Sequence, residues 1–289
     1  MDAQELLKKV RRIEIKTKGI SKHLFSGEYH SAFKGKGMSF SEVRAYQFGD
    51  DVRNIDWNVT ARTNDPFVKV FEEERELTVM LLIDISASSF FGSGSQSKRE
   101  LITELAAVLS FSAIQNNDKV GVIFFSSEIE RFIPPKKGKQ HILMIIRELL
   151  NIQPVHKGTN IAVALEYFNN LVKKRSISFL ISDFMADSFE TPLRIAKKRH
   201  DVIGIHVYDK LEKALPKVGL IPVKDPETGK RISVDSSHAD FNNKYSKIFQ
   251  ERKEETRKMF TKIGAAWIDV QTEESYVKTL LEFFKKRAS

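Results

Sequence analysis

Three short segments of oxygen-bearing side chains suggest metal chemistry. Asp84-Ile85-Ser86-Ala87-Ser88 and Ser182-Asp183-Phe184 each come at the end of an apolar run, and Gly158-Thr159-Asn160 precedes a helical pattern. Hydroxyls and carboxylates are hard ligands that suit Mg²⁺, with Mn²⁺ or Ca²⁺ as alternative ions. Because the 289 residues include no cysteine, any metal must be held by oxygen or imidazole. Taken alone, the first segment is equally explained as a turn that caps a helix.

The elements around these segments predict where the side chains gather. Residues 78–84 and 176–182 are apolar throughout, which is typical of strands buried on both faces. Strands and helices alternate after them, which predicts an α/β fold with a doubly wound, mostly parallel sheet and helices on both faces. Such sheets bind ligands beyond the carboxyl ends of their strands, where Asp84 and Asp183 would lie.

The alternation covers most of the chain. We predict strands at residues 78–84, 119–125, 129–133, 176–182, 202–208 and 265–270, and helices at residues 98–117, 140–150, 160–172, 190–200, 241–263 and 275–286. Residues 218–235 have the turn-rich composition of a β-hairpin excursion. We therefore expect an irregular N-terminal segment at residues 1–75, with a short helix near residues 3–10, and one α/β domain at residues 76–289.

The order and placement of the oxygen ligands resemble the metal-ion-dependent adhesion site (MIDAS) of von Willebrand factor A domains. The resemblance implies that Ser86 and Ser88 bind the cation directly, Thr159 directly or through water, and Asp84 and Asp183 largely through water. Such a shell leaves the cation with positive charge and an open position for an Asp or Glu of a protein partner. It implies a metal-dependent interaction module that is not an enzyme.

A second motif, dense in charged and aromatic residues, covers residues 44–62. In a structural interpretation the three aspartates pair with arginines and the tryptophan packs into the domain. In a functional interpretation the motif contacts a partner. In the structural interpretation, Asp50, Asp51 and Asp56 form ion pairs with Arg44, Arg53 and Arg62. The residues of the motif that either interpretation concerns are Arg44, Tyr46, Gly49, Asp50, Asp51, Arg53, Asp56, Trp57 and Arg62.

Together with residues 71–76, this motif resembles the signature of the DUF58 family, whose members join it to a von Willebrand A-like domain. The resemblance implies a bacterial adaptor or cofactor of a MoxR-type AAA+ ATPase in chaperone-like or assembly work. Many members carry N-terminal membrane segments, but no stretch here approaches the roughly 20 apolar residues of a membrane-spanning helix. The N-terminus also lacks the order of a signal peptide, so we expect a cytoplasmic protein.

Two other functions remain as alternatives. A metal-dependent phosphoester hydrolase that forms an aspartyl-phosphate would need a second aspartate two residues after Asp84, where this chain has Ser86. The net charge of +9 is compatible with nucleic-acid binding, but the basic residues are spread and no binding motif or aromatic platform accompanies them. The histidines form no His-x-x-x-His or His-x-His pair, which argues against zinc catalysis.

Overall fold

The computed structural model describes residues 38–73, 77–94, 96–224 and 231–288, together with residues 11 and 13. The described residues divide into two compact units, a smaller one at residues 38–77 and a larger one from Thr78 onwards. The helix predicted near residues 3–10 lies outside the described residues.

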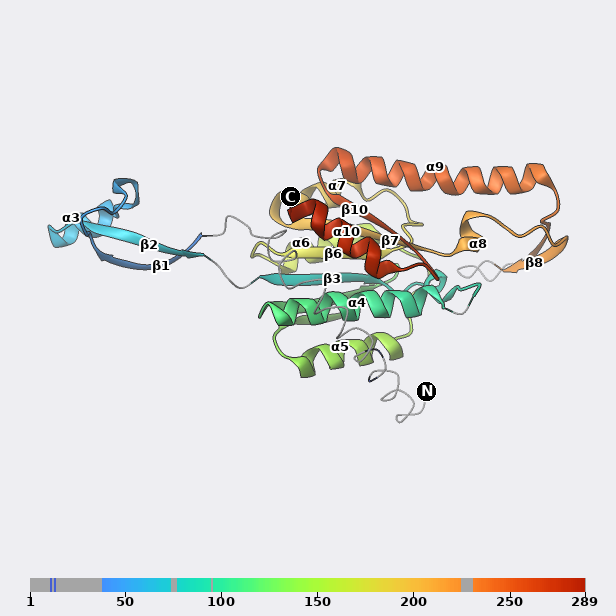
Figure 1. Cartoon of the computed structure of the whole chain (residues 1–289), viewed down its shortest axis with the longest axis horizontal. Coiled ribbons are helices and arrows are strands. Elements are labelled where there is room, and N and C mark those ends of the chain that lie inside the picture. Colours follow the sequence, from blue (N-terminus) through green and yellow to red (C-terminus); the bar gives the residue numbers. More distant parts are fainter. Residues whose placement is uncertain are drawn as a thin grey trace. The chain divides into compact units, whose positions relative to one another are not determined.

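A six-stranded sheet forms the centre of the larger unit (Figure 1). The strand order is β10-β7-β6-β3-β4-β5, and every neighbouring pair is parallel except β4 with β5. The predicted doubly wound, mostly parallel α/β sheet is therefore confirmed. The strands are β3 (Thr78–Asp84), β4 (Lys119–Phe125), β5 (Ile129–Lys136), β6 (Ile177–Ser182), β7 (Asp201–Tyr208) and β10 (Ala266–Gln271).

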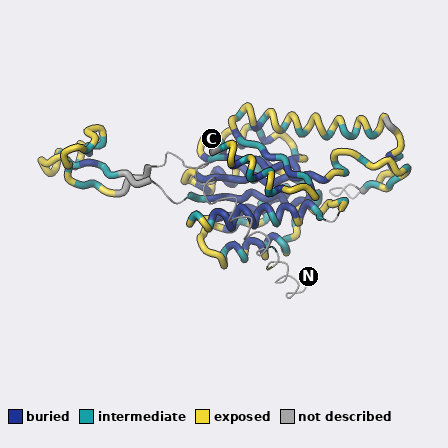
Figure 2. The backbone as a smooth tube through the Cα atoms, viewed as in Figure 1, coloured by how far each residue is buried: buried dark blue, intermediate teal, exposed yellow. Residues whose placement is uncertain are grey.

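Helices cover both faces of this sheet, which explains why its central strands are apolar throughout. Figure 2 shows the sheet as the most continuously buried part of the unit. Helices α4 and α5 pack together on one face, while α6, α7 and α9 contribute to the core on the other (Figure 1). The helices are α4 (Lys98–Gln115), α5 (Lys139–Asn151), α6 (Ile161–Leu171), α7 (Glu190–Arg199), α8 (Lys210–Lys213), α9 (Ala239–Ile263) and α10 (Tyr276–Ala288).

Local capping fixes where two of these helices begin. The Ser97 hydroxyl accepts from the Glu100 amide at 3.2 Å and the Glu100 carboxylate accepts from the Ser97 amide at 3.0 Å, so α4 starts at Lys98. Similarly, the Asn160 side chain accepts from the Val163 amide at 3.2 Å and caps α6.

The hairpin excursion is present as the antiparallel pair β8 (Leu220–Lys224) and β9 (Arg231–Asp235). Its connecting residues, 225–230, lie outside the described part of the chain.

The smaller unit contains regular elements that the sequence did not predict. Strands β1 (Met38–Ala45) and β2 (Phe67–Glu73) pair antiparallel, with a register shift between Phe40 and Glu42. Between them lie the 3-10 helix η1 (Val52–Asn54) and the helix α3 (Trp57–Thr63).

Two of the three predicted ion pairs in the charged motif are confirmed. The Arg44 guanidinium donates two hydrogen bonds of 2.7 Å to the Asp50 carboxylate. Arg53 Nε lies 3.3 Å from Asp51 Oδ1, and the same carboxylate accepts from the Arg53 amide and caps η1. Gly49, directly before Asp50, has a φ of +106°, a conformation that glycine adopts without a steric penalty.

The third predicted ion pair is wrong. Asp56 caps α3 and lies 3.5 Å from the ammonium of Lys69 on β2, and among the described residues no ion pair joins it to Arg62. Trp57 is 68% exposed, so the packing predicted for it is not found within its own unit. Trp57 is the first residue of a two-turn helix whose cap fixes its direction, and the unit that holds it is too small to enclose a tryptophan.

Candidate metal site

The two predicted carboxylate ligands lie at the point where the strand order of the sheet reverses. Along the chain, β4 is added on one side of β3 and β6 on the other. Asp84 is the last residue of β3, and Asp183 directly follows β6. Because the two strands are parallel neighbours, their carboxyl ends form one edge, which is where open α/β sheets bind ligands.

The side chain of Asp84 is buried and fixed on both oxygens. Oδ1 accepts a hydrogen bond of 2.9 Å from the Ser86 amide, and Oδ2 accepts one of 2.6 Å from the Ser182 hydroxyl. Ser182 is the last residue of β6, so this contact ties the ends of both central strands together.

The predicted hydroxyl ligands gather beside these carboxylates. The hydroxyl oxygens of Ser86 and Ser88 lie 3.1 Å apart, and the Ser89 hydroxyl donates to the Ser86 carbonyl at 2.7 Å, which stabilises the turn. Thr159, from the loop before α6, lines the same groove as Ser88. Gly158, in this loop, has a φ of +87°, which glycine adopts without a steric penalty, so the backbone can turn there.

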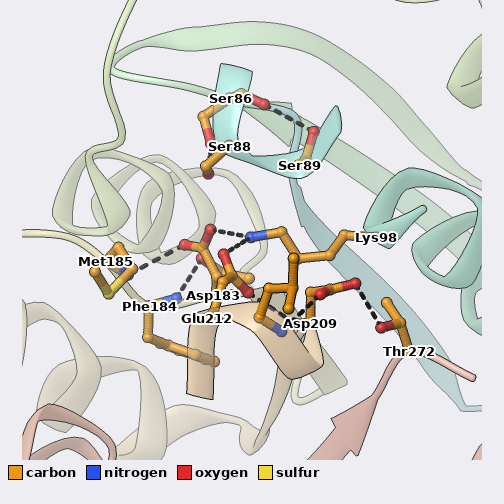
Figure 3. A network of polar contacts seen from close by, with 12 residues as sticks. Ser86, Ser88, Ser89, Lys98, Asp183, Phe184, Met185, Asp209, Glu212 and Thr272 are labelled. Atoms are coloured by element: carbon orange, nitrogen blue, oxygen red, sulfur yellow. Dashed lines mark hydrogen bonds and ion pairs between the residues drawn. The ribbon is translucent and has the colours of Figure 1, made fainter. Parts of the chain in front are cut away.

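Asp183 is held by a backbone turn and by a lysine (Figure 3). Its Oδ1 accepts from the Met185 amide at 3.1 Å, and its Oδ2 accepts from the Lys98 ammonium at 2.9 Å. The next residue, Phe184, has a φ of +55°, which is uncommon for an aromatic residue. The Phe184 amide donates to the Ser182 hydroxyl at 3.0 Å, and this bond helps to hold the turn.

Lys98 was not identified by the sequence analysis. Its side chain is 1% exposed, and the ammonium also donates to Glu212 Oε1 at 2.6 Å (Figure 3). Burial alone would lower the pKa of Lys98, but the two carboxylates raise it to about 12. Lys98 is therefore a permanent positive charge beside Asp183.

The two carboxylates of the site have opposite titration behaviour. Burial raises the pKa of Asp84 to about 6, and the negative charge of Asp183 acts in the same direction. Burial also acts to raise the pKa of Asp183, but the Lys98 ammonium holds it below its ordinary value. In the described part of the chain no lysine, arginine or histidine forms an ion pair with Asp84, and the buried Arg99 acts on it only through space.

The side chains present fit a hard divalent cation. Nowhere in the described ranges do three or more His, Cys, Asp or Glu residues form a metal-binding group. The candidate site is not a group of that kind, because it combines three hydroxyls with two carboxylates. Ser86, Ser88 and Thr159 would supply neutral oxygen ligands, and Asp84 and Asp183 would supply the balancing charge.

Two further carboxylates that the sequence analysis missed hold the surrounding loops. Glu130, on β5, accepts from the amides of Val155 and His156 at 3.0 and 2.9 Å and so fixes the loop that leads to Thr159. The ring of His156 lies 3.3 Å from the same carboxylate, which makes it part of this loop anchor.

Asp209, which follows β7, fixes the loop between β3 and α4. It accepts from the amide and hydroxyl of Ser93 and, at 2.8 Å, from the hydroxyl of Thr272. The serine- and glycine-rich loop between β3 and α4 is therefore attached to the carboxyl edge of the sheet.

Sequence comparisons place these features in a family. The model of a family described as "protein of unknown function DUF58" matches residues 42–255. An uncharacterized protein of Mycobacterium bovis is 28% identical over 292 residues, covering 99% of this chain and 91% of that protein. The uncharacterized protein YeaD of Bacillus subtilis is 29% identical over 109 residues, covering 38% of this chain and 25% of that protein.

Solved structures give weaker likenesses. An aerotolerance-related membrane protein from Bacteroides fragilis has a TM-score of 0.48 and 18% identity, covering 73% of this chain and 99% of that one. The SpRpn10 VWA domain has a TM-score of 0.39 and 11% identity, covering 72% of this chain and 94% of that one. The fold assignment therefore rests on the strand order itself.

No helix within the described ranges is long and apolar enough to cross a membrane.

The family model covers well over half of the sequence, and it includes both the charged motif of the smaller unit and all five candidate ligands. The chain belongs to the DUF58 family.

Proposed function

We propose that this chain is a non-catalytic protein-interaction module that depends on a divalent cation. The observation that carries the proposal is the meeting of Asp84 and Asp183 with the paired hydroxyls of Ser86 and Ser88 at one edge of the sheet. A cation bound by neutral hydroxyls keeps much of its positive charge. A carboxylate from a partner protein would complete its coordination.

The hydrogen bonds of the site support binding rather than hydrolysis. Ser86 and Ser88 bond to each other, and Lys98 donates to carboxylates. The hydroxyls of Ser86 and Ser88 also donate to the carboxylates of Asp84 and Asp183, an arrangement in which all four side chains can share one cation. No histidine or lysine among the described residues bonds to either hydroxyl as a general base.

We further propose that the partner is a MoxR-type AAA+ ATPase and that the pair works in the cytoplasm. This partner is what the resemblance to the DUF58 family implies, and the family model matches residues 42–255. In such a complex the chain would act as an adaptor, with its cation bound to an acidic residue of the ATPase or of a client protein.

Calorimetric titration of the chelator-treated protein with Mg²⁺ and Mn²⁺ tests the site. We expect saturable binding by the wild type, and loss of binding in Ser86→Ala, which removes one direct ligand. Ser237→Ala, an exposed serine beyond β9, is the matched control and should bind as the wild type does. Equal affinity in all three proteins would show that the hydroxyl cluster does not hold the cation.

The proposed partner is tested by capture of a purified MoxR-type ATPase with and without Mg²⁺. Asp84→Ala and Asp183→Ala should abolish capture while the folded domain persists. Retained capture by both variants would rule out the metal-dependent role.

A further inference from the structure

A groove of about 520 Å³ adjoins the candidate metal site. It is lined by Ser88 and Thr159, by the segment that follows β6, and by the helix α9. Those last two elements contribute Met185, Asp187, Phe189, Arg252, Glu255 and Met259 to the lining. The groove therefore connects two predicted cation ligands with a helix that sequence analysis did not assign to the site.

Part of the groove lining is apolar. Met185 is 50% exposed, Met259 is half-buried, and Phe189 is buried. Methionine side chains are flexible and polarisable, so they adapt to apolar groups of different shape. An apolar side chain could therefore pack beside a group that is bound to the cation.

Arg252 supplies a positive charge in the same groove. Its guanidinium lies 3.8 Å from the sulfur of Met185 and forms no ion pair within the described part of the chain. The neighbouring Lys253, in contrast, lies 3.1 Å from the Asp269 carboxylate. An unpaired guanidinium offers a planar fork of donors that matches a carboxylate.

Two acidic residues limit which segment fits. Asp187 and Glu255 also line the groove, so a uniformly acidic chain would be repelled there. A segment with two separate carboxylates and an apolar residue between them would match both the charges and the apolar part of the lining.

We propose that this groove binds an extended, acidic–apolar–acidic segment of a protein partner. The first carboxylate ligates the cation, the apolar side chain packs against Met185 and Met259, and the second carboxylate pairs with Arg252. The inference rests on the proposed function, because the first contact requires the cation. Arg252 then determines which acidic segments bind.

Selection from a random peptide library displayed on phage tests the groove. The wild-type protein is immobilised in Mg²⁺ and bound phage are released with EDTA. We expect enrichment of peptides with two acidic residues around an apolar one. Synthetic copies should bind Arg252→Ala about tenfold more weakly, which corresponds to about 1.4 kcal/mol for a charge-assisted contact. Met259→Glu should weaken binding as well.

Arg257→Ala is the matched control, since Arg257 is an exposed arginine of α9 that does not line the groove. Mg²⁺ titration of the wild type separates the two levels of the argument. If Mg²⁺ does not bind, the proposed function is wrong. If Mg²⁺ binds but no EDTA-released peptide is enriched, or if Arg252→Ala binds the peptides as Arg257→Ala does, only the groove inference is overturned.

Discussion

The buried carboxylate of Asp84 should reduce the stability of the metal-free protein. Its pKa is raised from the ordinary 3.8 to about 6, because burial and the charge of Asp183 disfavour the ionised form. At about 1.4 kcal/mol per pH unit, this difference corresponds to about 3 kcal/mol of lost stability once the carboxylate is ionised. A bound divalent cation would compensate for that loss.

Asp84→Asn removes the charge and keeps the shape of the side chain. The Ser86 amide can still donate to the remaining oxygen. At the other position an amide NH₂ replaces the acceptor of the Ser182 hydroxyl, and losing that hydrogen bond costs about 1 kcal/mol. We therefore expect the variant to be more stable than the wild type by about 2 kcal/mol, in EDTA at about pH 8.

Urea unfolding in EDTA at a series of pH values measures this difference. A raised folded-state pKa means that the native wild type takes up a proton at Asp84 before the unfolded chain does. Protonation of Asp84 therefore stabilises the folded wild type as the pH falls through about 6, and this stabilisation is complete below 3.8. The stability advantage of Asp84→Asn should shrink over that pH window. Asp183→Asn is the matched control and should be less stable, because it breaks the ion pair with Lys98.

Mg²⁺ should raise the free energy of unfolding of the wild type but not of Asp84→Asn, because only a native state that binds the ion gains from it. If Asp84→Asn is the less stable protein in EDTA at about pH 8, the charge of Asp84 does not destabilise the metal-free fold.

Three further variants have distinct expected outcomes. Lys98→Met leaves the buried carboxylate of Asp183 and the partly buried one of Glu212 unpaired, so it should lose about 3–5 kcal/mol in EDTA yet bind Mg²⁺ more tightly, as measured by unfolding and calorimetry. Glu130→Gln weakens the anchor of the loop that leads to Thr159 and should lower Mg²⁺ affinity severalfold; unchanged affinity would exclude a positioning role. Trp57→Ala should change stability by less than about 0.5 kcal/mol, because the side chain is 68% exposed; a larger loss in urea unfolding would show that it packs.

The sheet and the placement of Asp84 and Asp183 could be predicted because both follow from local patterns. Continuous apolar runs indicate buried parallel strands, and the carboxyl ends of such strands form one edge. The same patterns could not reveal Lys98, which reaches Glu212 across 114 residues of chain. A lysine at the start of a helix is usually solvated, and only the tertiary fold encloses it between two acids.

The charged motif shows the same limit at shorter range. Arg44 and Asp50 are six residues apart, and their pairing was expected from the sequence. Asp56 pairs instead with Lys69, which becomes its neighbour because Ile55 forms a bridge with Val68 and the Asp56 amide donates to the Phe67 carbonyl of β2. The exposure of Trp57 likewise depends on the direction set by a capped helix, which composition does not encode.

The charge balance at the edge of the sheet connects the missed residues with the predicted ones. Among Asp84, Asp183, Glu212 and Lys98 the acids outnumber the base, and the buried Arg99, which acts electrostatically on Asp84, offsets part of the excess. A cation would offset the remaining negative charge, which is costly in a region of low dielectric constant. Because Lys98 and Arg99 already balance part of the charge of the acids, a divalent ion would keep positive charge with which its open position can bind a partner's carboxylate.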